Sequence, residues 1–339
     1  MKKWLHLGLA GLLACAMLAT GCQTRMGGGD SQTQQAGANY PEKQVEIIVP
    51  FAAGGGVDLV ARAVSEYVSK EWNQSIVVVN KPGGGGAVGA EYALKQAKPD
   101  GYTVLADNVS STSMLESGLK SPPVKIADRI LISRTVSDPI GFAVAADSQW
   151  KDFTEFSDWA KQHPERLTWT SVGPAGTSAF AVADWLNAIG ADYSKTRMIA
   201  TTGAADSVPK VAGGHAVLAA HTVAELYPMA QAGKIRILGI QADKRSVYLP
   251  DVPTLEEQGI KGVAVRWWTG LTVPKGTPQQ VVDKWEAVLS KMANDPVFLD
   301  KAKKLHMEVG YLDSAAFTDF VKKETEYYTK LASERGMRK

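Results

Sequence analysis

The sequence predicts an α/β protein whose two blocks close on a ligand like a clamshell. Strand and helix patterns alternate along the 339 residues, an order that is typical of parallel sheets with right-handed crossovers. Each block also places a glycine-rich turn directly after a strand, at 52–56 and at 172–178. Ligands of open α/β sheets bind outside the carboxyl ends of the strands. A ligand held between two such edges would be enclosed by a hinge motion.

The first block alternates strands with helices. Apolar residues in 57–72 recur at helical spacing on one face, and 75–80 is rich in β-branched residues, which favours a strand. The predicted elements are, in order, strand 45–50, helix 57–72, strand 75–80, a glycine turn at 81–86, helix 87–97 and strand 102–106.

The second block repeats this alternation, and helices end the chain. Predicted strands cover 140–145, 168–171, 197–200, 217–220, 235–240 and 267–273. Predicted helices cover 153–162, 179–189, 278–293, 296–305 and 314–333. With 45% hydrophobic residues and a length above 300, the chain can bury the cores of two domains.

The first glycine turn is the strongest candidate for ligand binding. A helix that starts at such a turn presents unpaired N–H groups and a partial positive charge, so it can hold an anion. Asp58 lies in the first turn of this helix, where it can accept N–H bonds and order the loop. A P-loop is excluded because no Gly-Lys-Ser/Thr follows the glycines. The alternative is that the glycines serve only close packing of helix and strand.

The N-terminus has the pattern of an export signal. Lys2 and Lys3 precede an apolar stretch at 5–18 that is short for a membrane span. The segment 18–22 resembles a bacterial lipoprotein box, which predicts that residues 1–21 are removed and that Cys22 is lipidated. The alternative is an ordinary signal peptide with a stray cysteine.

The mature chain is predicted to be a tethered protein without a disulfide. Residues 22–39 are nearly free of apolar side chains, as in a flexible tether that holds a domain near a membrane. Cys15 lies in the signal, so Cys22 is the only mature cysteine. Removing the signal leaves as many basic as acidic side chains, which argues against nucleic-acid binding.

A dinucleotide-binding motif is a competing interpretation. Gly84, Gly86 and Gly89 have the spacing of the Rossmann fingerprint, and Asp107 ends the next predicted strand. Against this, Pro82 separates the strand from the glycines, the crossover helix is short, and an exported protein meets little free NAD.

Catalysis and metal binding receive weaker support. The five histidines show no metal-ligand spacing, although His221 at a strand end could line a cleft. The run 110–113 is rich in hydroxyls, which more often cap a helix or line a polar cleft than act as nucleophiles. No Gly-x-Ser-x-Gly elbow is present. For Trp267 and Trp268 we expect core packing, with an aromatic platform in the cleft as the alternative.

Six motifs in order resemble one family, the TctC-like solute receptors of tripartite tricarboxylate transporters, also called the Bug family of extracytoplasmic receptors. They span most of the predicted mature domain. The matching segments are 47–58, 78–86, 98–103, 232–236, 249–259 and 268–278.

This resemblance implies a two-lobed periplasmic-binding-protein fold of the second class, with residues 40–140 and 240–339 in lobe I and 141–239 in lobe II. It also implies that a ligand carboxylate is held between the two turns, largely by backbone N–H groups and water, without a cofactor or metal. The candidate ligand-binding residues are Phe51, Ala52, Ala53, Gly54, Gly55, Asp58, Asn108, Ser110, Ser171, Gly173, Pro174, Gly176, Thr177, Ser178, Thr202 and His221.

The sequence also departs from the family pattern. Many members carry proline near Ala52, a tyrosine and a lysine within the stretch that corresponds to 199–204, and a histidine where Ala179 and Phe180 stand. Phe180 would add apolar surface if it faced the cleft. The predicted ligand is therefore an organic carboxylate: a di- or tricarboxylate or an aromatic acid.

The predicted function is a non-enzymatic, lipid-anchored, monomeric receptor that delivers its solute to a membrane permease. An exported enzyme for a carboxylated substrate, using 110–113 or His221, is the alternative. A nucleotide-binding module at 84–89 is a third hypothesis.

Overall fold

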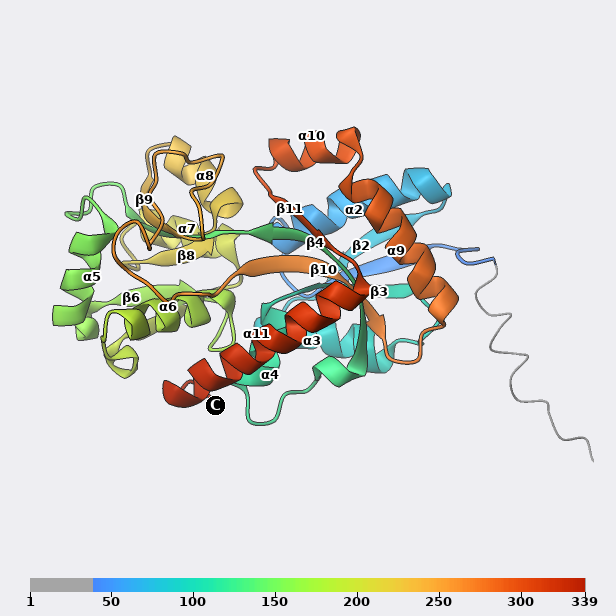
Figure 1. Cartoon of the computed structure of the whole chain (residues 1–339), viewed down its shortest axis with the longest axis horizontal. Coiled ribbons are helices and arrows are strands. Elements are labelled where there is room, and N and C mark those ends of the chain that lie inside the picture. Colours follow the sequence, from blue (N-terminus) through green and yellow to red (C-terminus); the bar gives the residue numbers. More distant parts are fainter. Residues whose placement is uncertain (1–38, 339) are drawn as a thin grey trace, which may run out of the picture.

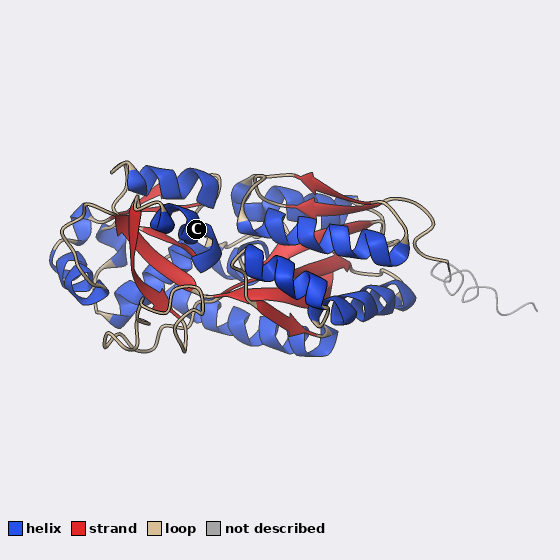
Figure 2. Cartoon of the chain, turned by 90° about the horizontal axis from the view of Figure 1, so that it is seen from above, coloured by secondary structure: helices blue, strands red, loops and turns tan. Residues whose placement is uncertain are grey.

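The computed structural model describes residues 39–338, which form two α/β lobes joined by crossing strands (Figures 1 and 2). Element labels follow Figure 1. The predicted signal segment and Cys22 lie outside the described residues.

The first lobe is built on a six-stranded sheet of order β11-β4-β10-β3-β1-β2. Its strands are β1 (Val45–Val49), β2 (Ile76–Asn80), β3 (Thr103–Asn108), β4 (Arg129–Asp138), β10 (Trp267–Pro274) and β11 (Val309–Leu312). The predicted parallel arrangement is confirmed for β1, β2 and β3, while β10 runs antiparallel to β3 and to β4. In β1 the side chains of Ile47 and Ile48 are both fully buried, because helices cover both faces of a parallel sheet.

Helices cover the first sheet. They are α2 (Gly56–Trp72), α3 (Ala87–Glu91), α4 (Leu115–Gly118), α9 (Gln279–Ala293), α10 (Pro296–Lys304) and α11 (Ser314–Glu334). The predicted helix 87–97 is found as α3 followed by a π-helical turn at Tyr92–Gln96. A second π-helical turn, Ser110–Met114, precedes α4, and single 3₁₀ turns occur at Gly84–Gly86 and Ile126–Asp128.

The second lobe contains two small sheets, β8-β5-β9 and β6-β7, linked by a bridge between Trp169 and Leu218. The strands are β5 (Ile140–Ala145), β6 (Thr168–Ser171), β7 (Arg197–Ala200), β8 (Ala219–Thr222) and β9 (Ile235–Gln241). The helices are α5 (Phe153–Gln162), α6 (Thr177–Ala188), α7 (Ala204–Ala212) and α8 (Val223–Gln231), with 3₁₀ turns at Pro164–Arg166 and Tyr193–Lys195. Trp185 of α6 packs on Phe142 and Phe153 in the core of this lobe, with ring centroids 5.9 and 5.1 Å away.

The chain crosses between the lobes after β4 and again between β9 and β10, and α11 bridges them as a third connection (Figure 1). Asp184 of α6 bonds to two of these connections, the β9–β10 crossing and α11. Its carboxylate accepts bonds from Tyr327 Oη of α11 at 2.6 Å, from the Ala264 N–H at 2.7 Å and from Gln241 Nε2 at 3.0 Å. The β9–β10 crossing and α11 are therefore fixed to one buried carboxyl group.

Five of the strands and α-helices have no counterpart among the predicted ones: β4, β11, α4, α7 and α8. β4 alternates apolar residues with Arg129, Ser133 and Thr135, whose polar side chains find partners inside the protein rather than in water. The helices α7 and α8 are short, and each has a proline in its interior, which lowers helix propensity. Tertiary contacts supply the stability that the local pattern lacks.

Candidate functional site: a cleft between the lobes

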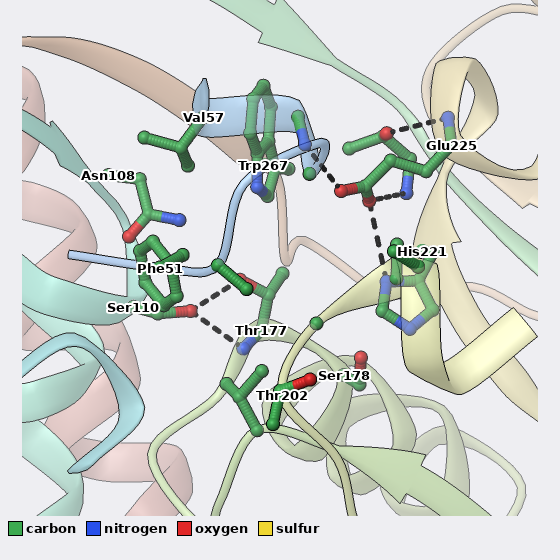
Figure 3. Close-up of a pocket in the computed structure, with 18 of the residues that line it drawn as sticks. Phe51, Val57, Asn108, Ser110, Thr177, Ser178, Thr202, His221, Glu225 and Trp267 are labelled. Carbon is green, nitrogen blue, oxygen red and sulfur yellow. Dashed lines mark hydrogen bonds and ion pairs between the residues drawn. The ribbon is translucent and has the colours of Figure 1, made fainter. Parts of the chain in front are cut away.

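A cavity of about 70 Å³ lies between the two lobes (Figure 3). Strand ends and helix starts of both lobes surround it. The lining residues are Phe51, Ala52, Ala53, Gly55, Gly56, Val57, Asn108, Ser110, Ile140, Val172, Thr177, Ser178, Thr202, Gly203, Ala204, Ala205, Ala220, His221, Thr222, Glu225 and Trp267.

Four helices begin at this cavity. The lining includes the first residues of α2 at 55–57, of α6 at 177–178 and of α7 at 203–205, and Thr222, the N-cap of α8. Each helix N-terminus carries about half a positive charge and unpaired N–H groups. Neither lysine nor arginine is found among the lining residues. The partial positive charges at the cleft therefore come from the backbone at these helix starts.

Asp58 organises the first glycine turn from beneath. Its carboxylate accepts the Gly54 N–H at 2.9 Å, the Arg62 guanidinium at 2.9 and 3.0 Å, and Asn80 Nδ2 at 2.9 Å. Burial by itself raises the pKa of Asp58, but these bonds outweigh it and hold the pKa below its ordinary value. Gly54 has a φ of 83°, a conformation that favours glycine. Asp58 therefore shapes the turn without lining the cavity.

Glu225 of α8 reaches across the cleft to the start of α2 (Figure 3). One carboxylate oxygen accepts the Gly56 N–H at 2.9 Å. The other accepts the Thr222 N–H at 3.3 Å and lies 3.4 Å from His221 Nδ1. Burial raises the pKa of Glu225, but the hydrogen bond from His221 and the two backbone N–H groups hold it below its ordinary value. A Cβ on Gly56 would lie only 3.1 Å from this carboxylate, so glycine permits the close approach.

Both ring nitrogens of His221 lie beside polar groups of the protein. Its Nε2 lies 2.7 Å from the hydroxyl of Ser207, which in turn contacts the hydroxyl of Thr170. With the ring proton on Nδ1, the ring donates to Glu225 and accepts from Ser207. Both nitrogens then have partners within the protein.

A second pair of residues joins the lobes at the other side of the cavity. Ser110 Oγ accepts the Thr177 N–H at 2.9 Å and lies 2.7 Å from Thr177 Oγ1. The neighbouring hydroxyls point into the protein: Ser111 donates to Asp107, Thr112 to the Asn108 carbonyl and Ser113 to Glu324. Within residues 39–338 none of these four hydroxyls is bonded to a histidine, so residues 110–113 do not form a nucleophile–base pair.

Ten of the sixteen residues proposed from the sequence line the cavity. They are Phe51, Ala52, Ala53, Gly55, Asn108, Ser110, Thr177, Ser178, Thr202 and His221. The others, Gly54, Asp58, Ser171, Gly173, Pro174 and Gly176, do not line it. Ser171 braces the second turn by donating to the Gly173 carbonyl at 2.8 Å, and Pro174 lines a different cavity beside Trp169 and Met337. Contact of any of these residues with a ligand stays a prediction.

Eleven lining residues are not among the sixteen candidates, although Gly56 and Val172 lie in the two predicted turns and a cleft position was the alternative for Trp267: Gly56, Val57, Ile140, Val172, Gly203, Ala204, Ala205, Ala220, Thr222, Glu225 and Trp267. One signal could have found two of them, because Thr222-x-x-Glu225 is a capping-box sequence that marks the start of α8. The tryptophans divide the two roles expected of them. Trp268 is fully buried against Phe317, and Trp267 lines the cavity. Phe180 packs on Tyr328 away from the cavity.

The dinucleotide interpretation does not fit the structure. Asp107, which would have to reach a ribose, is fully buried in an ion pair with Arg129. Gly89 instead allows α3 to approach β1 closely, since a Cβ there would lie 2.7 Å from Pro50. Among residues 39–338 no group of three or more potential metal ligands occurs. No helix of that same stretch is long and apolar enough to cross a membrane.

Comparison with known proteins gives a consistent family match. Residues 60–337 match the model of the tripartite tricarboxylate transporter family receptor, TctC. The UPF0065 protein in the gbd 5′ region of Cupriavidus necator is 31% identical over 296 residues, which cover 86% of this chain and 88% of that protein.

Solved structures show the same architecture. The periplasmic binding protein BugD superposes with a TM-score of 0.80 at 29% identity, covering 88% of this chain and 99% of that one. Two proteins from Rhodopseudomonas palustris share the fold at 23% identity. MatC with bound malate has a TM-score of 0.80 and covers 86% of this chain and 100% of its own. A protein with adipate has a TM-score of 0.81, and the match covers 88% of this chain and 99% of that protein.

Proposed function

This chain belongs to the tripartite tricarboxylate transporter receptor family, and on that premise we propose that it captures an organic carboxylate between its lobes and delivers it to a membrane permease. In this proposal the protein acts outside the cytoplasm, is lipid-anchored through Cys22, and consists of lobe I at 40–140 and 240–339 and lobe II at 141–239. No bond of the solute is made or broken.

The observation that carries the proposal is the convergence of four helix N-termini on one cavity without a basic side chain. A carboxylate placed there gains N–H donors and the field of the helix dipoles. An anion bound by several such bonds in a closed cleft can reach micromolar affinity, on the order of −8 kcal/mol.

Several lining amides are available for such a ligand. Among residues 39–338 no acceptor is recorded for the N–H groups of Ala53, Gly55 and Val57 in the first lobe. The same holds for Ser178 of α6 and for 203–205 at the start of α7. The amides of both predicted turns thus remain candidates for the ligand carboxylate.

Thermal-shift measurements test the ligand class. Malate and adipate are suitable first probes, since they occupy two proteins of the same fold. We expect at least one organic acid to raise the melting temperature, and native mass spectrometry to recover it unchanged after long incubation. Stabilisation by amines or sugars but by no acid would overturn the ligand class, and conversion of the acid would favour the exported-enzyme alternative.

A further inference from the structure

Glu225 is the one acidic side chain among the lining residues of the cleft. Its side chain is 13% exposed, so it is largely withdrawn from water yet reaches the cavity. A carboxylate offers about four acceptor positions. Three are used by the Gly56 N–H, the Thr222 N–H and His221 Nδ1. One position is left for a group inside the cavity.

The same carboxylate divides the cleft into two unequal ends. It bonds to one N–H at the start of α2, that of Gly56, and to one at the start of α8, that of Thr222, so its negative charge lies at the end of the cleft where these two helices begin. The starts of α6 and α7 keep free N–H groups at Ser178 and at 203–205. A ligand carboxylate is therefore favoured beside α6 and α7 and is repelled beside Glu225.

The groups around Glu225 do not cancel this preference. His221 offers the cavity no free N–H, since its nitrogens face Glu225 and Ser207. Val57, Ile140 and Ala220 add apolar lining, which suits the methylene groups of a short chain. The end of the ligand that meets Glu225 must supply a hydrogen-bond donor, or an acceptor position on a buried carboxylate stays unfilled.

We infer that Glu225 is a specificity-determining residue, and that this receptor selects short carboxylic acids that carry an ammonium or hydroxyl donor at the opposite end. The inference rests on the proposed function, because it assumes a carboxylate ligand in the cleft. Ammonium is preferred over hydroxyl, since a bond between two charged groups is the stronger one. An unsubstituted dicarboxylate is disfavoured, because its second carboxylate would face Glu225.

A series of four-carbon acids tests this on the wild-type protein. 4-Aminobutanoate, 4-hydroxybutanoate, butanoate and succinate share one carboxylate and differ only at the far end. By calorimetry we expect 4-aminobutanoate to bind at least tenfold more tightly than butanoate and succinate, with 4-hydroxybutanoate between them. Equal or tighter binding of succinate or butanoate would overturn the inference and leave the proposed function standing. Failure of every carboxylate, with binding of the amine 1-aminobutane, would overturn both.

The variant Glu225→Gln tests whether Glu225 causes the preference for 4-aminobutanoate over succinate. Glutamine is tolerated at this position of a capping box, so α8 should keep its start. In the variant we expect the preference for 4-aminobutanoate over succinate to fall at least tenfold, mainly through tighter succinate binding. Glu256→Gln, an exposed glutamate that does not line the cavity, is the matched control and should leave the series unchanged. An unchanged preference in a folded Glu225→Gln variant would overturn the assignment to Glu225, and the wild-type series decides the ligand class even if that variant does not fold.

Discussion

Two buried glutamates in different regions of the molecule have opposite charge states. Glu225 in the cleft accepts two backbone N–H groups and lies beside His221, and its pKa is held below the ordinary value. Glu324, in the middle of α11, bonds to the Trp268 indole at 2.9 Å and to the Ser113 hydroxyl. Burial raises the pKa of Glu324 to about 8, so it is largely neutral near pH 7.

The two charge states differ because the two sites offer different hydrogen-bond donors. Burial destabilises the charged carboxylate at both sites. Only the cleft adds helix N-termini and backbone N–H donors, which compensate for the lost hydration. An anion is stable in the cleft because of backbone donors fixed by the fold. The donors to Glu324 are side chains, among them the Trp268 indole and the Ser113 hydroxyl, and they do not offset its burial. The following predictions test this contrast.

The first prediction introduces a carboxylate at the start of α7, beside N–H groups that are free for a ligand. Thr202 is exposed and lies next to the free N–H groups of 203–205. In Thr202→Glu the new carboxylate would take these donors and repel a bound one by about 4 kcal/mol at 4 Å in an effective dielectric of about 20. We expect acid affinity to fall at least about 100-fold by calorimetry, whereas Thr202→Gln keeps most of it. Unchanged affinity in the glutamate variant would show that the ligand lies elsewhere.

The second prediction concerns Asp58, a third buried carboxylate supplied with donors. Asp58→Asn removes the charge that Arg62, Asn80 and the Gly54 N–H share. We expect the free energy of unfolding to fall by about 2 kcal/mol at pH 7, the scale of hydrogen bonds to a charged group. Urea denaturation measures it. Glu66→Gln, on the exposed face of the same helix, should change stability far less, and equal losses in both variants would contradict the role given to Asp58.

The third prediction perturbs the contact between Glu225 and α2. A Cβ at Gly56 would lie 3.1 Å from the Glu225 carboxylate and 3.2 Å from Trp267, so both must shift. We expect Gly56→Ala to weaken acid binding about tenfold, about 1.4 kcal/mol, as the lobes lose this contact. Gly55→Ala is the matched control, since its Cβ would meet only the Ala52 carbonyl at 3.6 Å. Equal affinities in the two variants would count against a role for this contact.

The fourth prediction uses the pH dependence of Glu324. Its pKa in the folded protein is about 8, above the unfolded value near 4.3, so the folded state holds an extra proton between these values. The stabilisation is therefore complete below about pH 4 and is lost as the pH rises toward 8, at roughly 1 kcal/mol per pH unit. We expect Glu324→Gln to gain stability relative to wild type between pH 5 and pH 8 in urea titrations. A constant difference across that range would show that Glu324 is charged throughout.

The sequence indicated much of the fold because most elements follow local patterns. The strands β1, β2 and β3 and the helices α2, α5, α9 and α11 were predicted within a few residues, since apolar spacing and glycine or proline boundaries mark them. The strand β4 was not, because polar side chains such as Arg129 and Thr135 are satisfied by distant parts of the chain. Arg129, for example, pairs with Asp107 of β3.

The residues of the candidate site also fall into those that local sequence predicted and those that depend on distant contacts. The residues at the first glycine turn and the hydroxyls of Ser110, Thr177 and Ser178 were proposed from the sequence and line the cavity, because turns after strands gather at one sheet edge. Glu225 was missed, since its sequence signal marks only a helix start. Its contact with Gly56 joins residues 169 positions apart.

Local sequence patterns were enough to specify the two glycine turns, the helices that start beyond them and the family to which the chain belongs. Those features depend on backbone conformations that a few neighbouring residues set. Which N–H groups at the helix starts stay open to a ligand, and which are bonded by Glu225, could be seen only in the folded protein. That outcome depends on how the two lobes pack across the cleft, where side chains remote in sequence compete for the same N–H groups.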